Sequence, residues 1–223
     1  MNPLGEVLHD PGVIRDWRPA QWNAWLPLTR NARLLGRCLF LFERNGLLDA
    51  VPQRLIDQMR GALAQTRYVQ VQAKRELRHV KRVLDAENIP LIVLKGGAYL
   101  VAELPPQDWR NLSDVDLLVP EADIERAEQA LKTKGWVPSG EFDDYDQRYY
   151  RDWMHEVPPL VHIDRETEVD LHHNLAPPVS RIRIDAARLW ERAADTPAQY
   201  GFKTRVLGPE DMLLHNAVHL FMN

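Results

Sequence analysis

Residues 91–119 read LIVLKGGAYLVAELPPQDWRNLSDVDLLV, and this stretch decides the predicted fold. A short apolar run ends in Lys-Gly-Gly at 95–97, a helix-like segment follows, and Asp114 and Asp116 begin a second apolar run. Alternate residues of a strand point to the same side, so we expect these two carboxylates to project together. Neighbouring carboxylates repel each other unless they are protonated or bind cations. The stretch therefore predicts a divalent metal site beside a glycine turn.

Strand-like and helix-like segments alternate after residue 88. The pattern predicts strands at 91–94, 115–119, 136–137, 160–164, 168–172 and 204–207. It predicts helices at 98–104, 121–134, 186–193 and from Pro209 onward, and a loop or lid at 138–156. Together these segments predict an α+β fold, in which a small mixed β-sheet is flanked by helices.

The residues before 89 are expected to be mainly helical. Residues 1–18 contain several Pro and Gly breakers and are expected to be irregular, whereas one helix is predicted at 19–44. A longer helix follows, with apolar residues stepping by threes and fours until about Asn88. We therefore expect a helical N-terminal region at 1–88 and a core at 89–223. The last helix is still apolar-periodic where the chain ends, so the core is expected to continue into a C-terminal helical segment.

A second alternating segment supplies a third candidate carboxylate. Glu168, Asp170 and His172 alternate with two apolar residues, so their side chains should share one face of a strand. If this strand lies beside Asp114 and Asp116, one of its two carboxylates completes a three-carboxylate site. Such a site suits Mg²⁺ or Mn²⁺. Two such ions can clamp the attacking and leaving oxygens in phosphoryl or nucleotidyl transfer.

The glycine turn adds a candidate phosphate site. The backbone N–H groups of Gly96 and Gly97 would stand at a helix start, where an anion is favoured. Lys95 could contact phosphate or pair with a carboxylate. No Gly-Lys-Ser/Thr follows, so the turn is not a Walker loop.

The composition is ordinary for a soluble globular protein, with 45% apolar and 27% charged residues. A net charge of −4 gives no global basic field for nucleic acid. Cys38 is the single cysteine, which rules out an internal disulfide and fits a reducing compartment. It lies in an apolar segment and is expected to serve packing. With no apolar run of membrane-spanning length and no secretory signal, we expect a cytoplasmic protein without a membrane partner.

The Leu-Lys-Gly-Gly motif at 94–97 and the Arg-x-x-Ser-Asp-x-Asp motif at 110–116 resemble the DNA polymerase β-type nucleotidyltransferase superfamily. More closely, they resemble the uncharacterised bacterial nucleotidyltransferase family and its AbiEii-type toxin relatives. The segments VDLH at 169–172 and GPEDMLLH at 208–215 are similar to the third acidic strand and the downstream helix of that family. The resemblance covers roughly residues 75–223, and the first 70 residues fit it less specifically.

This resemblance implies a minimal nucleotidyltransferase sheet, an NTP donor and two divalent ions, Mg²⁺ or Mn²⁺. Asp114, Asp116 and Asp170 would be both the catalytic residues and the metal ligands, and Asp170 could also accept the proton of the acceptor. Glu168 competes with Asp170 for the third position. Many superfamily members have Gly-Ser where this chain has Gly-Gly, so one hydroxyl contact to phosphate is absent. The implied nucleotide-binding residues are Lys95, Gly96, Gly97, Arg110 and Ser113.

The predicted function is transfer of an NMP from an NTP to a hydroxyl of an RNA, a protein or a small molecule, with release of pyrophosphate. One alternative is a non-catalytic module of the same fold that senses nucleotides or docks a partner. A second is a toxin-like RNA modifier, which a basic run at 74–82 would support. His215 and His219 have the spacing of some zinc ligands but lack the glutamate of a metalloprotease motif. Neither the base of the NTP nor the oligomeric state is indicated.

Overall fold

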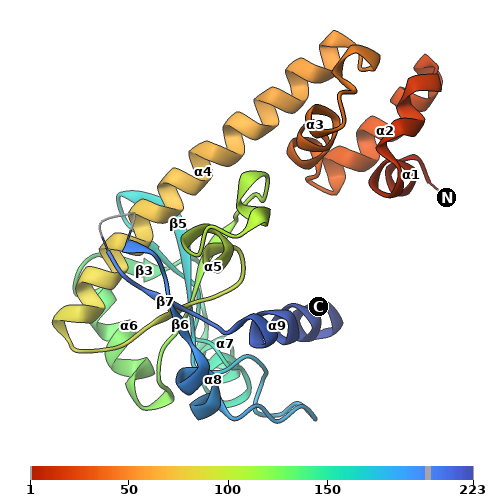
Figure 1. The fold of residues 1–223 in the computed structure, drawn as a ribbon. Coiled ribbons are helices and arrows are strands. Elements are labelled where there is room, and N and C mark those ends of the chain that lie inside the picture. The colour runs from red at the N-terminus through yellow and green to blue at the C-terminus, as the bar shows by residue number, and fades with distance from the viewer. Residues whose placement is uncertain (1, 199–201, 223) are drawn as a thin grey trace. The chain divides into compact units, whose positions relative to one another are not determined.

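The computed structural model describes residues 2–198 and 202–222. The chain forms two compact units (Figure 1). The helical unit comprises residues 1–70 and 106–111, and the sheet unit comprises residues 71–105 and 112–223. The division at residues 70 and 71 falls inside a long helix, whereas the sequence led us to expect a division after residue 88.

The helical unit consists of short helices and the first part of the long helix α4. Its elements are α1 (Pro3–His9), η1 (Pro11–Asp16), α2 (Pro19–Asn31), α3 (Leu35–Arg44), η2 (Leu48–Ala50) and the start of α4 (Gln53–Ala86). The single long helix expected to end near Asn88 is confirmed, because α4 runs unbroken from Gln53 to Ala86.

Two expectations for the N-terminal region were wrong. The first residues are helical rather than irregular, because Asn2 Oδ1 accepts a hydrogen bond from the Gly5 N–H at 2.8 Å and Pro3 occupies the first turn, where no N–H is needed. The helix expected at 19–44 is divided into α2 and α3. Arg33 has a left-handed φ of 56°, and the Leu34 N–H bonds back to the Thr29 carbonyl at 2.9 Å. This bond ends α2 without the glycine that usually marks such a helix end.

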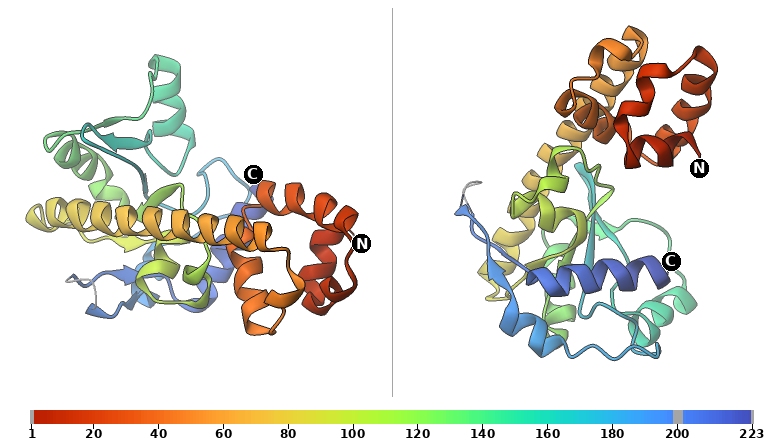
Figure 2. Two further views of the ribbon diagram at one scale, coloured as in Figure 1. Left: turned by 90° about the horizontal axis from the view of Figure 1, so that it is seen from above. Right: turned by 45° about the vertical axis from the view of Figure 1, so that its right-hand side comes forward.

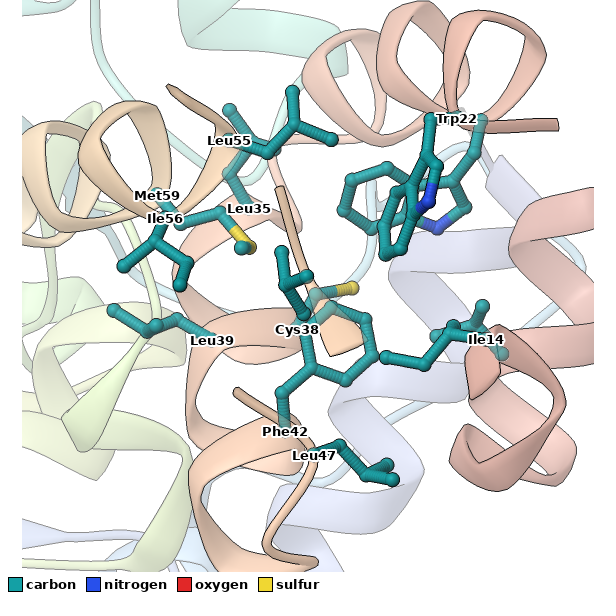
Figure 3. Packing of buried hydrophobic residues seen from close by; sticks show 13 residues of the cluster. Ile14, Trp22, Leu35, Cys38, Leu39, Phe42, Leu47, Leu55, Ile56 and Met59 are labelled. Carbon is teal, nitrogen blue, oxygen red and sulfur yellow. The ribbon is translucent and has the colours of Figure 1, made fainter. Parts of the chain in front are cut away.

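The core of the helical unit is rich in aromatic residues. Trp22 and Trp25 pack edge to face with ring centroids 5.6 Å apart, and Trp25 also approaches Phe42. Figure 3 shows Cys38 beside Phe42 within this cluster. Cys38 is fully buried, and burial raises the pKa of its thiol to about 12. This environment agrees with a packing role.

The sheet unit contains a seven-stranded mixed sheet in the order β3-β4-β5-β2-β1-β7-β6. The pairs β2–β5 and β1–β7 are parallel, and the other pairs are antiparallel. The expected α+β class with a mixed sheet is therefore confirmed. The strands are β1 (Ile92–Val93), β2 (Asp114–Leu118), β3 (Trp136–Pro138), β4 (Leu160–His162), β5 (Arg165–His172), β6 (Ala194–Asp195) and β7 (Arg205–Val206).

Helices flank this sheet, as expected. They are α5 (Lys95–Val101), α6 (Ile124–Lys132), α7 (Asp144–Arg148), α8 (Ala186–Arg192) and α9 (Pro209–Met222), with the short 3-10 helices η3 (Pro105–Asp108) and η4 (Glu121–Asp123) and the π-helix η5 (Tyr149–Trp153). Helices α5 and α9 lie side by side (Figures 1 and 2). Asn216 of α9 donates a hydrogen bond to the Tyr99 hydroxyl of α5. Among the described residues, none of the helices combines the length and apolar character that a membrane span requires.

Two local expectations for the sheet unit were wrong. The segment 138–156, expected to be a loop, contains α7 and η5. The Asp143 side chain caps α7 by accepting hydrogen bonds from the N–H groups of Tyr145 and Asp146. The turn between β4 and β5 lies at 163–164 rather than between the predicted strands 160–164 and 168–172, because β5 begins at Arg165.

Candidate active site

The parallel pairing of β2 with β5 brings the candidate carboxylates together. In this register Asp114 lies opposite Glu168, and Asp116 lies opposite Asp170. Buried apolar residues alternate with the acids on both strands and determine which face of the sheet the acids occupy; they are Val115, Leu117, Val169 and Leu171. One ligand atom each of Asp116, Asp170 and His172 lies within 4.8 Å of the other two. These three residues therefore form a group that could hold a metal ion.

Asp116 is the most deeply buried of these carboxylates, with 1% of its surface exposed. Its Oδ1 lies 2.6 Å from Lys95 Nζ and 3.1 Å from His172 Nε2. Burial alone would raise its pKa, but the hydrogen bond from His172 and the ion pair with Lys95 outweigh burial and hold the pKa at about 2. Asp116 is thus a permanent anion.

Asp170 has the opposite character. Its Oδ1 is buried and has no hydrogen-bond partner among the described residues. Burial and the nearby Asp116 charge raise its pKa to about 7. A buried oxygen without a partner beside a permanent anion is the arrangement that a divalent cation would satisfy.

Asp114 stands at the more open end of β2. Ser113 Oγ donates a hydrogen bond to Asp114 Oδ2 at 3.1 Å. Burial and the charge of Asp116 raise the pKa of Asp114. The ionised forms of the three candidate carboxylates therefore repel one another, and Lys95, paired with Asp116, offsets this negative charge only in part.

The Lys95-Gly96-Gly97 segment forms the first turn of α5 rather than a turn before a helix that begins at residue 98. The Leu94 N–H donates to the Asp116 carbonyl at 2.9 Å, which anchors this turn to β2. Lys95 has a left-handed φ of 44°. At Gly97 a Cβ would lie 2.9 Å from Val93 Cγ1, so close packing also requires glycine there.

Most of the predicted nucleotide-binding residues lie in the sheet unit. Lys95, Gly96 and Gly97 begin α5, and Ser113 contacts Asp114. Arg110 instead belongs to the helical unit, where its carbonyl accepts a hydrogen bond from Gln70. The predicted set is therefore divided between the two units.

A cavity of about 530 Å³ adjoins the acidic group through Lys95, which also lines its wall. Its aromatic lining includes Tyr149 and Trp153, and its polar lining includes His155, His215 and His219. Burial, together with the neighbouring His172 and the positive charge of Lys95, lowers the pKa of His155 to about 3 and that of His215 to about 4. Both imidazoles are therefore neutral at physiological pH.

Sequence reasoning missed His155 and Glu156. They lie in a segment expected to be a loop, yet an isolated bridge pairs Glu156 with His172 at the end of β5. No motif in the sequence signals this pairing. The contact of His172 with Asp116 follows the alternation of β5, which the sequence did show.

Comparison with known proteins supports one family. A search of curated proteins found no match. A crystal structure from Thermotoga maritima, provisionally assigned as a nucleotidyltransferase, is similar with a TM-score of 0.47 and 15% identity, covering 64% of this chain and 81% of that chain. The family model described as "Uncharacterised nucleotidyltransferase" matches residues 18–223, and the chain therefore belongs to this nucleotidyltransferase family.

Proposed function

We propose that this protein transfers an NMP from an NTP donor to a hydroxyl acceptor and releases pyrophosphate, with two Mg²⁺ or Mn²⁺ ions as cofactors. The observation that carries the proposal is the register of β2 and β5, which sets Asp116 beside Asp170, with Asp114 two residues away. Membership of the nucleotidyltransferase family supports the same reaction class.

Asp114, Asp116 and Asp170 would hold the ions. The partnerless Oδ1 of Asp170 and the excess negative charge fit such ligands. When bound, the ions would supply charge neutralisation at the attacking and leaving oxygens. Asp170 would accept the proton of the acceptor hydroxyl.

Lys95, Gly96, Gly97 and Ser113 would bind the triphosphate, and Arg110 remains a proposed contact. The N–H groups in the first turn of a helix lack intrahelical acceptors, which leaves those of Gly96 and Gly97 available to an anion. Lys95, now paired with Asp116, could exchange that partner for phosphate when metal neutralises the carboxylate.

The cavity beside Lys95 would hold the nucleoside of the donor. A volume of about 530 Å³ lies in the range of small-molecule sites. Tyr149 and Trp153 offer surfaces on which a base can stack. The described residues that line the cavity include no Asp or Glu, which disfavours a polycationic ligand.

Calorimetric titration of Mg²⁺ and Mn²⁺, with and without each NTP, tests this function. We expect metal-dependent binding of one NTP in the wild type and its loss in Asp116→Asn. Pyrophosphate release should disappear in Asp114→Ala and Asp116→Ala, whereas Asp164→Asn, a change at the exposed turn after β4, should behave as wild type. Turnover that survives in either alanine variant would refute the mechanism.

One observation favours a second candidate, the non-catalytic module. The ammonium group of Lys95 already neutralises Asp116 at 2.6 Å, as a cation in a metal-free nucleotide sensor could. In that case NTP would bind equally well in EDTA, and no pyrophosphate would appear with any acceptor.

The relation to AbiEii-type toxins and an RNA acceptor remains a prediction. Growth arrest on expression that is lost in Asp114→Ala would support it.

A further inference from the structure

A second group of potential ligands lies next to the three carboxylates. It consists of His155, Glu156 and His172, and one ligand atom of each lies within 4.8 Å of the other two. His172 is 1% exposed, and His155 lies in the wall of the cavity. None of the three proposed magnesium ligands, Asp114, Asp116 and Asp170, belongs to this group.

The backbone fixes the geometry of this group. Glu156 and His172 form an isolated antiparallel bridge. On either side of the bridge, the His173 N–H donates to the His155 carbonyl at 2.8 Å, and the Val157 N–H donates to the Leu171 carbonyl at 3.0 Å. Backbone hydrogen bonds therefore fix the segment around Glu156 to the end of β5. The backbone that carries the three side chains is in position before any ligand binds.

The contact between His172 and Glu156 requires a cation. His172 Nε2 lies 3.1 Å from Asp116 Oδ1, which also accepts from Lys95 Nζ at 2.6 Å, so His172 contacts this oxygen as an N–H donor. In a neutral ring this leaves Nδ1 as an acceptor. Yet Nδ1 is buried without a hydrogen bond, and Glu156 Oε2, also an acceptor, lies 3.1 Å away. Two acceptors at this distance repel each other unless a proton or a metal ion lies between them.

The position of His155 favours the metal ion. A proton shared by His172 and Glu156 would need no third group, yet the ring of His155 lies with its centroid 5.3 Å from that of His172. His155 Nδ1 is likewise buried without a hydrogen-bond partner among the described residues. Two ligands of a tetrahedral zinc ion, with bonds of about 2.0–2.1 Å, stand about 3.3 Å apart, close to the separation of Nδ1 and Oε2.

We propose that His155, Glu156 and His172 bind a zinc ion, separate from the magnesium sites of the transfer reaction. Two imidazoles and one carboxylate suit Zn²⁺, whereas Mg²⁺ prefers oxygen ligands alone. The contact of His172 with Asp116 completes a carboxylate–histidine–zinc arrangement, in which the carboxylate fixes the tautomer and orientation of the ring. The zinc ion would in turn hold His172 as a donor to Asp116.

Zinc binding can be measured on the full chain without any enzymatic assay. The protein, freed of any histidine tag and treated with EDTA, is titrated with Zn²⁺ against a chromophoric chelator, and bound Co²⁺ is followed by its visible spectrum. We expect one tight zinc ion per chain and four-coordinate Co²⁺. His155→Gln and Glu156→Gln should each weaken binding at least about tenfold, since even outer-shell partners act on that scale.

Two variants serve as controls. His79→Gln removes a histidine of α4 outside both ligand groups and should bind zinc as wild type does. Asp170→Asn should keep zinc while losing metal-dependent NTP binding, which separates this proposal from the proposed function. The absence of tight zinc, binding insensitive to His155→Gln and Glu156→Gln, or loss only in Asp170→Asn would overturn the proposal. If His155→Gln fails to fold, Glu156→Gln and the wild-type Co²⁺ spectrum decide.

Discussion

Replacing Asp170 with asparagine should stabilise the metal-free protein at alkaline pH while abolishing catalysis. An asparagine side chain would keep the shape of the native one but would remove the charge that burial and Asp116 disfavour. The variant therefore separates the destabilising effect of this charged carboxylate from its proposed role in metal binding.

The magnitude follows from the pKa of Asp170, which rises from 3.8 in the unfolded chain to about 7 in the folded protein. Between these values the folded protein retains a proton that the unfolded chain has released, so the free energy of unfolding falls as pH rises. At about 1.4 kcal/mol per pH unit, the loss reaches about 4 kcal/mol above pH 7. Below pH 3.8 the carboxyl group is neutral in both states, and the loss disappears.

Hydrogen exchange of the β2 and β5 amides in EDTA, read by mass spectrometry, measures this effect within the sheet unit. At pH 8 the Asp170→Asn variant should be more stable than wild type by about 2–4 kcal/mol, and near pH 4 the difference should vanish. Saturating Mg²⁺ at pH 8 should stabilise the wild type and reduce the difference in stability between it and Asp170→Asn. Asp164→Asn, the exposed control, should have the stability of the wild type both at pH 8 and near pH 4. A variant no more stable than wild type at pH 8 would refute the reasoning.

Three further outcomes test the packing around the site. Arg165→Met should lower the free energy of unfolding by about 3–5 kcal/mol, because it removes the ion-pair partner of the Glu76 carboxylate, whose side chain is 1% exposed. Adding Glu76→Gln should recover much of this loss, and urea unfolding measures both effects. Gly97→Ala should lower the free energy of unfolding by about 1–3 kcal/mol, because the added Cβ clashes with Val93. Adding Val93→Ala should remove the clash and restore stability, which thermal unfolding measures. Cys38, with a pKa of about 12, should react with a thiol reagent only as fast as the protein opens, and equal rates in native and unfolded protein would contradict its burial.

Many helices and strands could be predicted from the sequence because apolar periodicity and breaker residues are local features of it. Apolar periodicity identified α4, and Pro209 correctly marked the start of α9. Errors arose where a side chain, rather than a breaker, decided the backbone. Asn2 and Asp143 cap short helices in segments that looked irregular, and Arg33 ends α2 without glycine. Capping gains of about 1 kcal/mol are too small to stand out in a sequence that carries several breakers.

The partners of Asp116 could be predicted only in part. The alternation at 168–172 placed His172 on the face of the acids, but the ion pair of Asp116 with Lys95 depends on how α5 starts. The Lys-Gly-Gly motif was expected to form a turn, and instead it begins the helix with Lys95 in a left-handed conformation. A residue of this type adopts that conformation only when its surroundings favour it, and here the backbone bond from Leu94 to Asp116 supplies the constraint.

The choice between Glu168 and Asp170 shows where sequence patterns stop being informative. Strand alternation has a period of two, so a shift of β5 by two residues along β2 would leave every apolar residue facing the core. Such a shift would set Glu168 opposite Asp116 with no change in the hydrophobic pattern. The actual register is favoured by the hydrogen bond between His172 of β5 and Asp116 of β2, and the pairing of Glu156 with His172 holds the end of β5. If zinc binds where we propose, it strengthens the same contacts, so the ion that positions His172 would also help to keep Asp170 beside Asp116.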